Sequence, residues 1–219
     1  YLLDRDHSLE IVDTEAMEWG NDRSSEYVAE KKPRLVAMVV FGHQPSASTQ
    51  MMVSAGEICA SIKQRSPEQD IIIVGGHVSA LPELTLNDEA VDYVCVGEGE
   101  NAIIDLANSI SNGDDYSNIT NLWVKKNTGN ITKNSISRPV EIDKLPQVTD
   151  VGLFGEKRFY RPMGGKIRRL LPVETHRGCP YTCSFCNSPG QNRLYGDGDF
   201  NKGLSFFRKK SMDLVKNEI

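Results

Sequence analysis

The chain has 219 residues, of which 39% are hydrophobic and 25% are charged, and this balance excludes disordered and fibrous proteins. The length exceeds what one domain usually needs, because single-core domains cluster at about 100 to 150 residues. The net charge of −5 is unevenly divided: residues 1–150 carry 12 Lys and Arg against 24 Asp and Glu, whereas residues 151–219 carry 13 against 6. This change of sign predicts a domain boundary near residue 150. We interpret the basic second part as a solvated face rather than a nucleic-acid site.

The sequence contains no run of the roughly 18 apolar residues that a transmembrane helix needs. Its first residues also lack the pattern of a secretory signal peptide, so a cytoplasmic location is expected. Five cysteines are an odd number, and three of them fall within eight residues of one another. That arrangement is poor material for disulfides and favours a metal site in a reducing compartment.

The first half alternates short apolar runs with amphipathic stretches, which is typical of an α/β fold with a parallel sheet covered by helices. The pattern predicts strands at residues 9–13, 35–41, 71–74 and 91–96, and helices at residues 48–65 and 100–110.

Two of these strands end in glycine-containing turns. Gly75 and Gly76 follow the third strand, and Gly97, Glu98 and Gly99 follow the fourth. Glycine lets the backbone approach a ligand closely, and open parallel sheets bind ligands at the carboxyl ends of their strands. These five residues are therefore candidate cofactor-binding residues, although tight strand-to-helix turns would need the glycines equally.

The rest of the chain divides into a connection and a second unit. Residues 121–134 predict a β-hairpin that turns near Gly129, and the proline-containing stretch at 138–150 predicts a linker. A second unit then begins with an expected strand at 167–174, followed by a cysteine-rich loop and a helix at 203–219. The expected domains are residues 1–120, 121–150 and 151–219.

Cys179, Cys183 and Cys186 form the cysteine-rich loop. Thiolates suit both zinc and iron–sulfur clusters, but a structural zinc site needs a fourth protein ligand, such as His176 or a distant donor. A four-iron cluster with one open iron needs only three, so we favour the cluster and assign His176 no metal. Cys59 and Cys95 lie apart and are expected to be small buried side chains.

The segment from Arg177 to Cys186 resembles the radical S-adenosylmethionine (SAM) superfamily, whose cysteines follow the first strand of a β/α barrel. The resemblance implies a [4Fe-4S] cluster whose open iron binds the amino and carboxylate groups of SAM. It further implies that one electron from the cluster cleaves SAM to a 5′-deoxyadenosyl radical and that Phe185 lies near the adenine. It also implies an electron donor such as a flavodoxin or ferredoxin.

The first half resembles the cobalamin-binding-type domain that precedes many radical SAM barrels. The resemblance rests on the segments 72–77, 81–83, 91–94 and 97–100, and it implies a Rossmann-like sheet that holds the corrin over the mouth of a partial β/α barrel. The Asp-x-His-x-x-Gly pattern that supplies a lower cobalt ligand in other cobalamin proteins is absent. His43 follows a predicted strand but lacks those companions, so we do not assign it as a ligand.

The expected protein is a cobalamin-dependent radical SAM enzyme, a methyltransferase or ring-modifying enzyme acting on a small molecule or natural product. A tRNA methylthiotransferase-like enzyme is an alternative, disfavoured because that family carries three further cysteines in its first domain. A non-catalytic corrinoid- or zinc-binding module is another. The family's first strand and its later barrel strands have no counterpart here, so the sequence is expected to be a fragment that is inactive alone.

Overall fold

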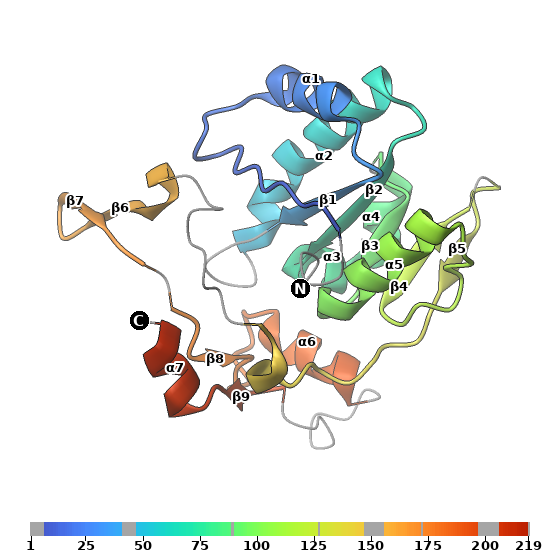
Figure 1. Ribbon diagram of the computed structural model, residues 1–219. Helices are drawn as coiled ribbons and strands as arrows, with labels where there is room; N and C mark the ends of the chain where they lie inside the picture. Colours follow the sequence, from blue (N-terminus) through green and yellow to red (C-terminus); the bar gives the residue numbers. More distant parts are fainter. Residues whose placement is uncertain are drawn as a thin grey trace.

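The computed structural model describes residues 7–40, 47–88, 90–126, 128–146, 156–171, 173–196 and 206–218. Its first part is a five-stranded sheet with helices on both faces. The second part has shorter elements: in Figure 1, α6, α7, β8 and β9 lie below the sheet, and the β6–β7 pair lies to its left. None of the helices in these residues is long and apolar enough to cross a membrane.

The sheet is Rossmann-like but mixed. Its strands run in the order β1 (Leu35–Val40), β2 (Asp70–Gly75), β3 (Tyr93–Cys95), β4 (Leu122–Lys125) and β5 (Ile131–Lys133). The first three are parallel, and the β4–β5 hairpin adds two antiparallel strands. The hairpin is found where the sequence predicts it, but its strands continue the sheet, with Tyr93 paired to Val124.

The helices of the first part are α1 (Asn21–Lys31), α2 (Ala47–Arg65), α3 (Gly76–Ala80), α4 (Pro82–Asp88) and α5 (Glu100–Asn112). Ile71 and Ile73 of β2 pack in the core formed with α2, α3 and α4, whereas Ile72 and Val74 pack in the core formed with α5. All four side chains are buried. The strand is apolar throughout because helices cover both faces of the sheet.

Cys59 and Cys95 are confirmed as buried side chains, one in each core. Burial, together with the charges of Glu100 and Glu98, raises the pKa of the Cys95 thiol to about 12. Such a thiol stays protonated near neutral pH and is a poor metal ligand.

The predicted strand at residues 9–13 is wrong. This stretch has no strand structure, and a turn follows it, in which the Asp13 carboxylate accepts a hydrogen bond from Ala16 N at 3.0 Å and the Asp13 carbonyl accepts one from Met17 N at 2.9 Å. An aspartate that bonds to nearby backbone amides favours turns over strands.

The second part contains η2 (Ile142–Lys144), η4 (Glu156–Phe159), β6 (Tyr160–Met163), β7 (Lys166–Arg169), β8 (His176–Arg177), α6 (Ser188–Tyr195), β9 (Arg208–Lys209) and α7 (Met212–Glu218). β6 pairs with β7 and β8 pairs with β9, both antiparallel. These elements supply only part of a barrel.

The expected strand at 167–174 is wrong in extent. β7 ends at Arg169 after pairing back on β6, and the strand that leads into the cysteines is β8. The expected helix at 203–219 is also too long, because residues 208–209 form β9 and helix begins only at Met212. Residues 197–205 lie outside the described structure, and α6 has no counterpart in the sequence prediction.

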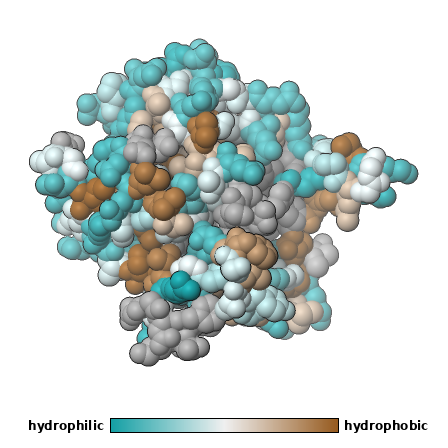
Figure 2. Space-filling model, turned by 180° about the vertical axis from the view of Figure 1, so that it is seen from behind, coloured by the Kyte–Doolittle hydropathy of each residue, from teal (hydrophilic) through white to brown (hydrophobic). Residues whose placement is uncertain are grey.

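Exposed apolar side chains are spread over the surface. On the face shown in Figure 2 they form several small groups between polar residues. In the second part the exposed large apolar residues are Tyr160, Met163, Ile167, Leu171, Tyr181, Phe185 and Met212.

Candidate functional site

The turn after β2 lies against the end of β1. Gly75 has φ +151°, and a Cβ atom there would overlap the carbonyl oxygen of Val40, its partner in the sheet register. The close approach of the two strands therefore requires glycine at this position.

Helix α6 packs against both glycine turns. The Gly76 carbonyl accepts hydrogen bonds from Asn187 Nδ2 at 3.3 Å and Gln191 Nε2 at 3.5 Å. A Cβ atom on Gly97, which has φ +93°, would lie 2.7 Å from the Tyr195 hydroxyl. Burial at this contact raises the pKa of Tyr195. The segment after the cysteines is thus joined to the carboxyl ends of β2 and β3.

Gly99 is enclosed by the core of its own domain. A Cβ atom there would lie 3.3 Å from Ile103 Cδ1 and 3.5 Å from Val74 Cγ1. To make room for this Cβ atom, the Ile103 side chain would have to move by only a few tenths of an ångström. Gly99 is therefore less tightly constrained than Gly75.

Glu98 lies between the two parts of the molecule. Its Oε2 accepts hydrogen bonds from Arg208 Nη1 at 2.9 Å and from Val140 N at 2.7 Å, and its Oε1 contacts Arg208 Nη2. Burial pushes the pKa of Glu98 upward, but these hydrogen bonds and the charges of Arg208 and Arg177 outweigh it and hold the pKa below its ordinary value. Glu98 is therefore an ionised group whose oxygens are occupied by protein donors.

The cysteine loop begins at a tight crossing. Gly178 has φ +78°, and a Cβ atom there would overlap the carbonyl oxygen of Phe206 just before β9. Glycine at this position lets β8 and the segment before β9 come together immediately before Cys179.

Cys183 and Cys186 line a cavity of about 360 Å³ together with Thr182, Ser184, Asn187, Pro189, Gly190 and Arg193. Cys186 N donates to the Cys183 carbonyl at 3.2 Å, and Ser188 N donates to Cys186 Sγ at 3.4 Å. Cys183 is exposed, whereas Cys179 and Cys186 are partly buried. Among the residues that the structure describes, no group of three His, Cys, Asp or Glu side chains is arranged to hold a metal ion.

The aromatic and histidine residues of this region differ in their surroundings. Phe185 is 89% exposed beside the cysteine cavity. His176 lies 5.4 Å from the Phe207 ring, and its Nδ1 is 3.0 Å from Thr175 Oγ1. These contacts give His176 a structural place in the β8–β9 pair. His43 lies outside the described residues.

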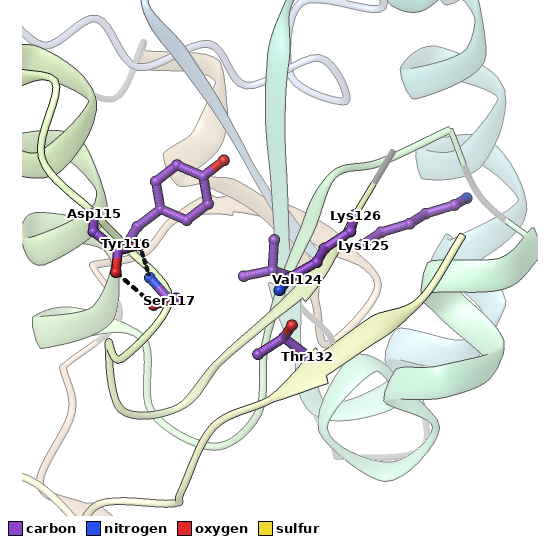
Figure 3. A pocket seen from close by; sticks show the side chains of 7 residues that line it. All are labelled: Asp115, Tyr116, Ser117, Val124, Lys125, Lys126 and Thr132. Atoms are coloured by element: carbon purple, nitrogen blue, oxygen red, sulfur yellow. Dashed lines mark hydrogen bonds between the residues drawn. The ribbon is translucent and has the colours of Figure 1, made fainter. Parts of the chain in front are cut away.

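A second cavity of about 330 Å³ lies elsewhere, between the segment after α5 and the β4–β5 hairpin (Figure 3). Lys125 N in this cavity donates to Asp92 O at 2.9 Å, so the cavity lies beside the start of β3 rather than its end. It contains none of the glycines or cysteines predicted as site residues; its lining is Asp115, Tyr116, Ser117, Val124, Lys125, Lys126 and Thr132.

Sequence reasoning missed the groups that connect the two parts. Sequence analysis places Arg177 only within the cysteine segment and does not single out Arg208. Helix α6 begins with Ser188, Pro189 and Gly190, and glycine and proline are poor helix formers. A usable signal was present for α6, because proline is favoured in the first turn of a helix.

Comparison with known proteins agrees with this arrangement. Residues 1–107 match the sequence family described as B12 binding domain. The chain is 27% identical over 191 residues to an uncharacterized methyltransferase of Pyrococcus horikoshii, covering 85% of this chain and 38% of that protein. It is 29% identical over 134 residues to the cobalamin-dependent radical SAM methyltransferase TokK of Streptomyces tokunonensis, covering 60% of this chain and 19% of that protein.

The fold is also known from solved structures. The radical SAM methyltransferase TsrM of Kitasatospora setae, solved with tryptophan and a SAM analogue, superposes with a TM-score of 0.67 at 21% identity. The match covers 99% of this chain and 40% of TsrM, so the chain spans well under half the length of the proteins it matches. Residues 1–107 thus match a B12 binding domain, and over a larger part of its length the chain is similar to cobalamin-dependent radical SAM methyltransferases such as TokK.

Proposed function

We propose that this chain is the cobalamin-binding and cluster-binding portion of a radical SAM methyltransferase that acts on a small molecule or natural product. The observation that carries the proposal is the contact of α6 with Gly76 and Gly97. Because α6 begins two residues after Cys186, this contact brings the cysteine loop near the carboxyl ends of the strands, where parallel sheets bind ligands. The matches to a B12 binding domain and to TokK support the same assignment.

The donor set fits a [4Fe-4S] cluster. Three thiols on one loop can each bind one iron, and two of these thiols, those of Cys183 and Cys186, line a cavity. The Ser188 amide donates a hydrogen bond to the Cys186 sulfur, and such hydrogen bonds tune the reduction potential of a cluster. The thiols are not arranged as a ready metal site, so binding would have to draw the loop together, as metal binding often does. When bound, the cluster supplies one electron to SAM. Phe185, which is 89% exposed between two of the cysteines, is the aromatic residue that we assign to the adenine.

Anaerobic reconstitution with iron and sulfide tests the cluster. A bound cluster gives a coloured protein with visible absorption from thiolate-to-iron charge transfer, whereas a zinc module stays colourless after the same treatment. Iron and sulfide in equal amounts, near four of each per chain, are expected for this cluster type. Colourless protein that takes up zinc alone would contradict the proposal.

For cobalamin, we expect Gly76→Leu to weaken hydroxocobalamin binding at least about tenfold, or about 1.4 kcal/mol. Gly76 follows β2 at the carboxyl end of the parallel strands, and a leucine side chain there would take up space next to the proposed corrin site. Equilibrium dialysis measures the affinity. Gly20→Leu is the matched control, because no atom lies within 4 Å of a Cβ at Gly20. Equal affinities for the Gly76 variant and the unchanged protein would remove Gly76 from the site.

The substrate and electron donor are proposed by class. The similar protein TsrM was solved with tryptophan, which supports a small molecule as methyl acceptor. A flavodoxin or ferredoxin is a suitable source of single electrons. Transfer of a labelled methyl group from SAM by the whole protein, tested on a panel of small aromatic and heterocyclic acceptors, would identify the substrate; ring closure without label transfer would instead indicate a ring-modifying enzyme.

A further inference from the structure

Four charged side chains join the turn after β3 to the β8–β9 pair. Arg177 and Arg208 are directly opposite each other in the β8–β9 register. Glu98 contacts Arg208 through both of its oxygens and lies 3.6 Å from Arg177 Nη1, and Glu100 Oε1 contacts the same Arg177 nitrogen. The carboxylates come from the segment that matches the B12 binding domain (residues 1–107, here the B12-type domain), and both guanidinium groups come from the strands beside the cysteine loop.

The two arginines would repel each other without these carboxylates. Like charges directly opposite in an antiparallel pair are destabilising. The β8–β9 pair spans only two residues on each strand, so it offers few backbone hydrogen bonds to resist that repulsion. Glu98 contacts both cations and thereby offsets it.

The cluster is also largely removed from water. The exposed fraction of the side chain is 11% for Arg208, 17% for Glu98 and 25% for Arg177. Removing one member of a buried ion pair leaves an uncompensated charge, which is far more destabilising than removing both members. The Val140 amide and carbonyl bind Glu98 and Arg208 respectively, so the linker between the two parts joins the same network.

We propose that Glu98 is a positioning residue that holds β8 and β9, and with them the start of the cysteine loop, against the B12-type domain. Arg177 is two residues before Cys179, and only Gly178 separates them. Displacement of Arg177 therefore moves the first thiol of the loop. This role replaces the expectation that Glu98 touches the corrin, because its oxygens already have protein partners. This role of Glu98 depends on the proposed function only in the experiment that measures cluster retention.

The test compares Glu98→Gln, Arg208→Gln and the double variant in the intact protein without cofactors. Gln keeps the shape of Glu98 but removes the carboxylate that contacts both arginines. Arg177 keeps its contacts with Glu100 and Glu174, whereas Arg208 loses its carboxylate partner. We expect backbone amides at 176–177 to exchange hydrogen at least about tenfold faster in Glu98→Gln, and the Cys179 thiol to be alkylated correspondingly faster. The double variant, which removes one charge of each sign, should return both rates to within about threefold of the unchanged protein. Glu141→Gln is the control, because its ion pair with Lys144 is exposed.

Three outcomes would overturn the proposal. The first is unchanged exchange and alkylation in Glu98→Gln. The second is a double variant with rates as fast as the single, since a purely local packing defect would not be relieved by removing Arg208. The third is a loss of hydroxocobalamin affinity in Glu98→Gln with unchanged exchange, which would return Glu98 to the corrin site. After reconstitution, Glu98→Gln should also lose iron to a chelator faster than the double variant. Failure of that last measurement alone, with the exchange result as expected, would count against the cluster rather than against the role of Glu98.

Discussion

Cys183→Ala is expected to abolish retention of the iron–sulfur cluster after anaerobic reconstitution. The loop offers three thiols, and a four-iron cluster bound to SAM needs all three because its remaining iron must stay open. Two thiolates leave a second iron without a protein ligand. Cys179→Ala and Cys186→Ala should behave in the same way, and iron and sulfide analysis of the desalted protein measures the loss.

The control for this series is Cys59→Ala. Cys59 lies on α2, is buried in the core and is far from the cysteine loop in sequence, so its removal should leave the iron content unchanged. The cluster assignment would be wrong if the Cys183 variant retained as much iron as the unchanged protein.

Gly75→Ala is expected to lower the free energy of unfolding by about 3 kcal/mol or more, because it combines backbone strain with a steric overlap. Gly75 has φ +151°, and the new methyl group would collide with the Val40 carbonyl oxygen. That oxygen belongs to the neighbouring strand, so relief requires β1 and β2 to move apart at their carboxyl ends. Urea denaturation followed by circular dichroism measures the change.

Gly20→Ala separates this overlap from a general cost of replacing glycine. Gly20 precedes α1 with φ −83°, and a Cβ there meets no atom within 4 Å. Its replacement should cost no more than about 1 kcal/mol, the usual range for a helix N-cap. Similar losses for the two variants would show that the β1–β2 approach is not the reason for glycine at position 75.

The sheet could be predicted from the sequence because its strands are buried on both faces. The apolar runs at 35–41 and 71–74 correspond to β1 and β2, and the glycine turns mark where the following helices begin. The hairpin was located by its turn residues. Its membership in the sheet could not be predicted, because the pairing of Tyr93 with Val124 depends on residues far apart in the sequence.

The second part was harder to predict because long-range contacts decide its local structure. β8 and β9 are two residues each and exist by pairing across more than thirty residues, with Arg177 opposite Arg208. α6 is stabilised by its contacts with Gly76 and Gly97 rather than by helix propensity. The cysteines remain the part of the site that spacing predicts best, whereas the partners of Glu98 depend on the fold.

The direction of the β4–β5 hairpin limits how this sheet can be extended. β4 starts opposite the end of β3, and β5 runs back so that its last residue, Lys133, pairs with Trp123 near the start of β4. Two strands of opposite direction thus return the chain to the side from which it left. With one extra strand of four residues, the chain would leave the sheet about 13 Å away, at the opposite ends of the strands. An insertion of two strands would therefore let the chain leave the sheet on the same side as it does now, whereas an insertion of one strand would use part of the connection between β5 and β8 to return it there.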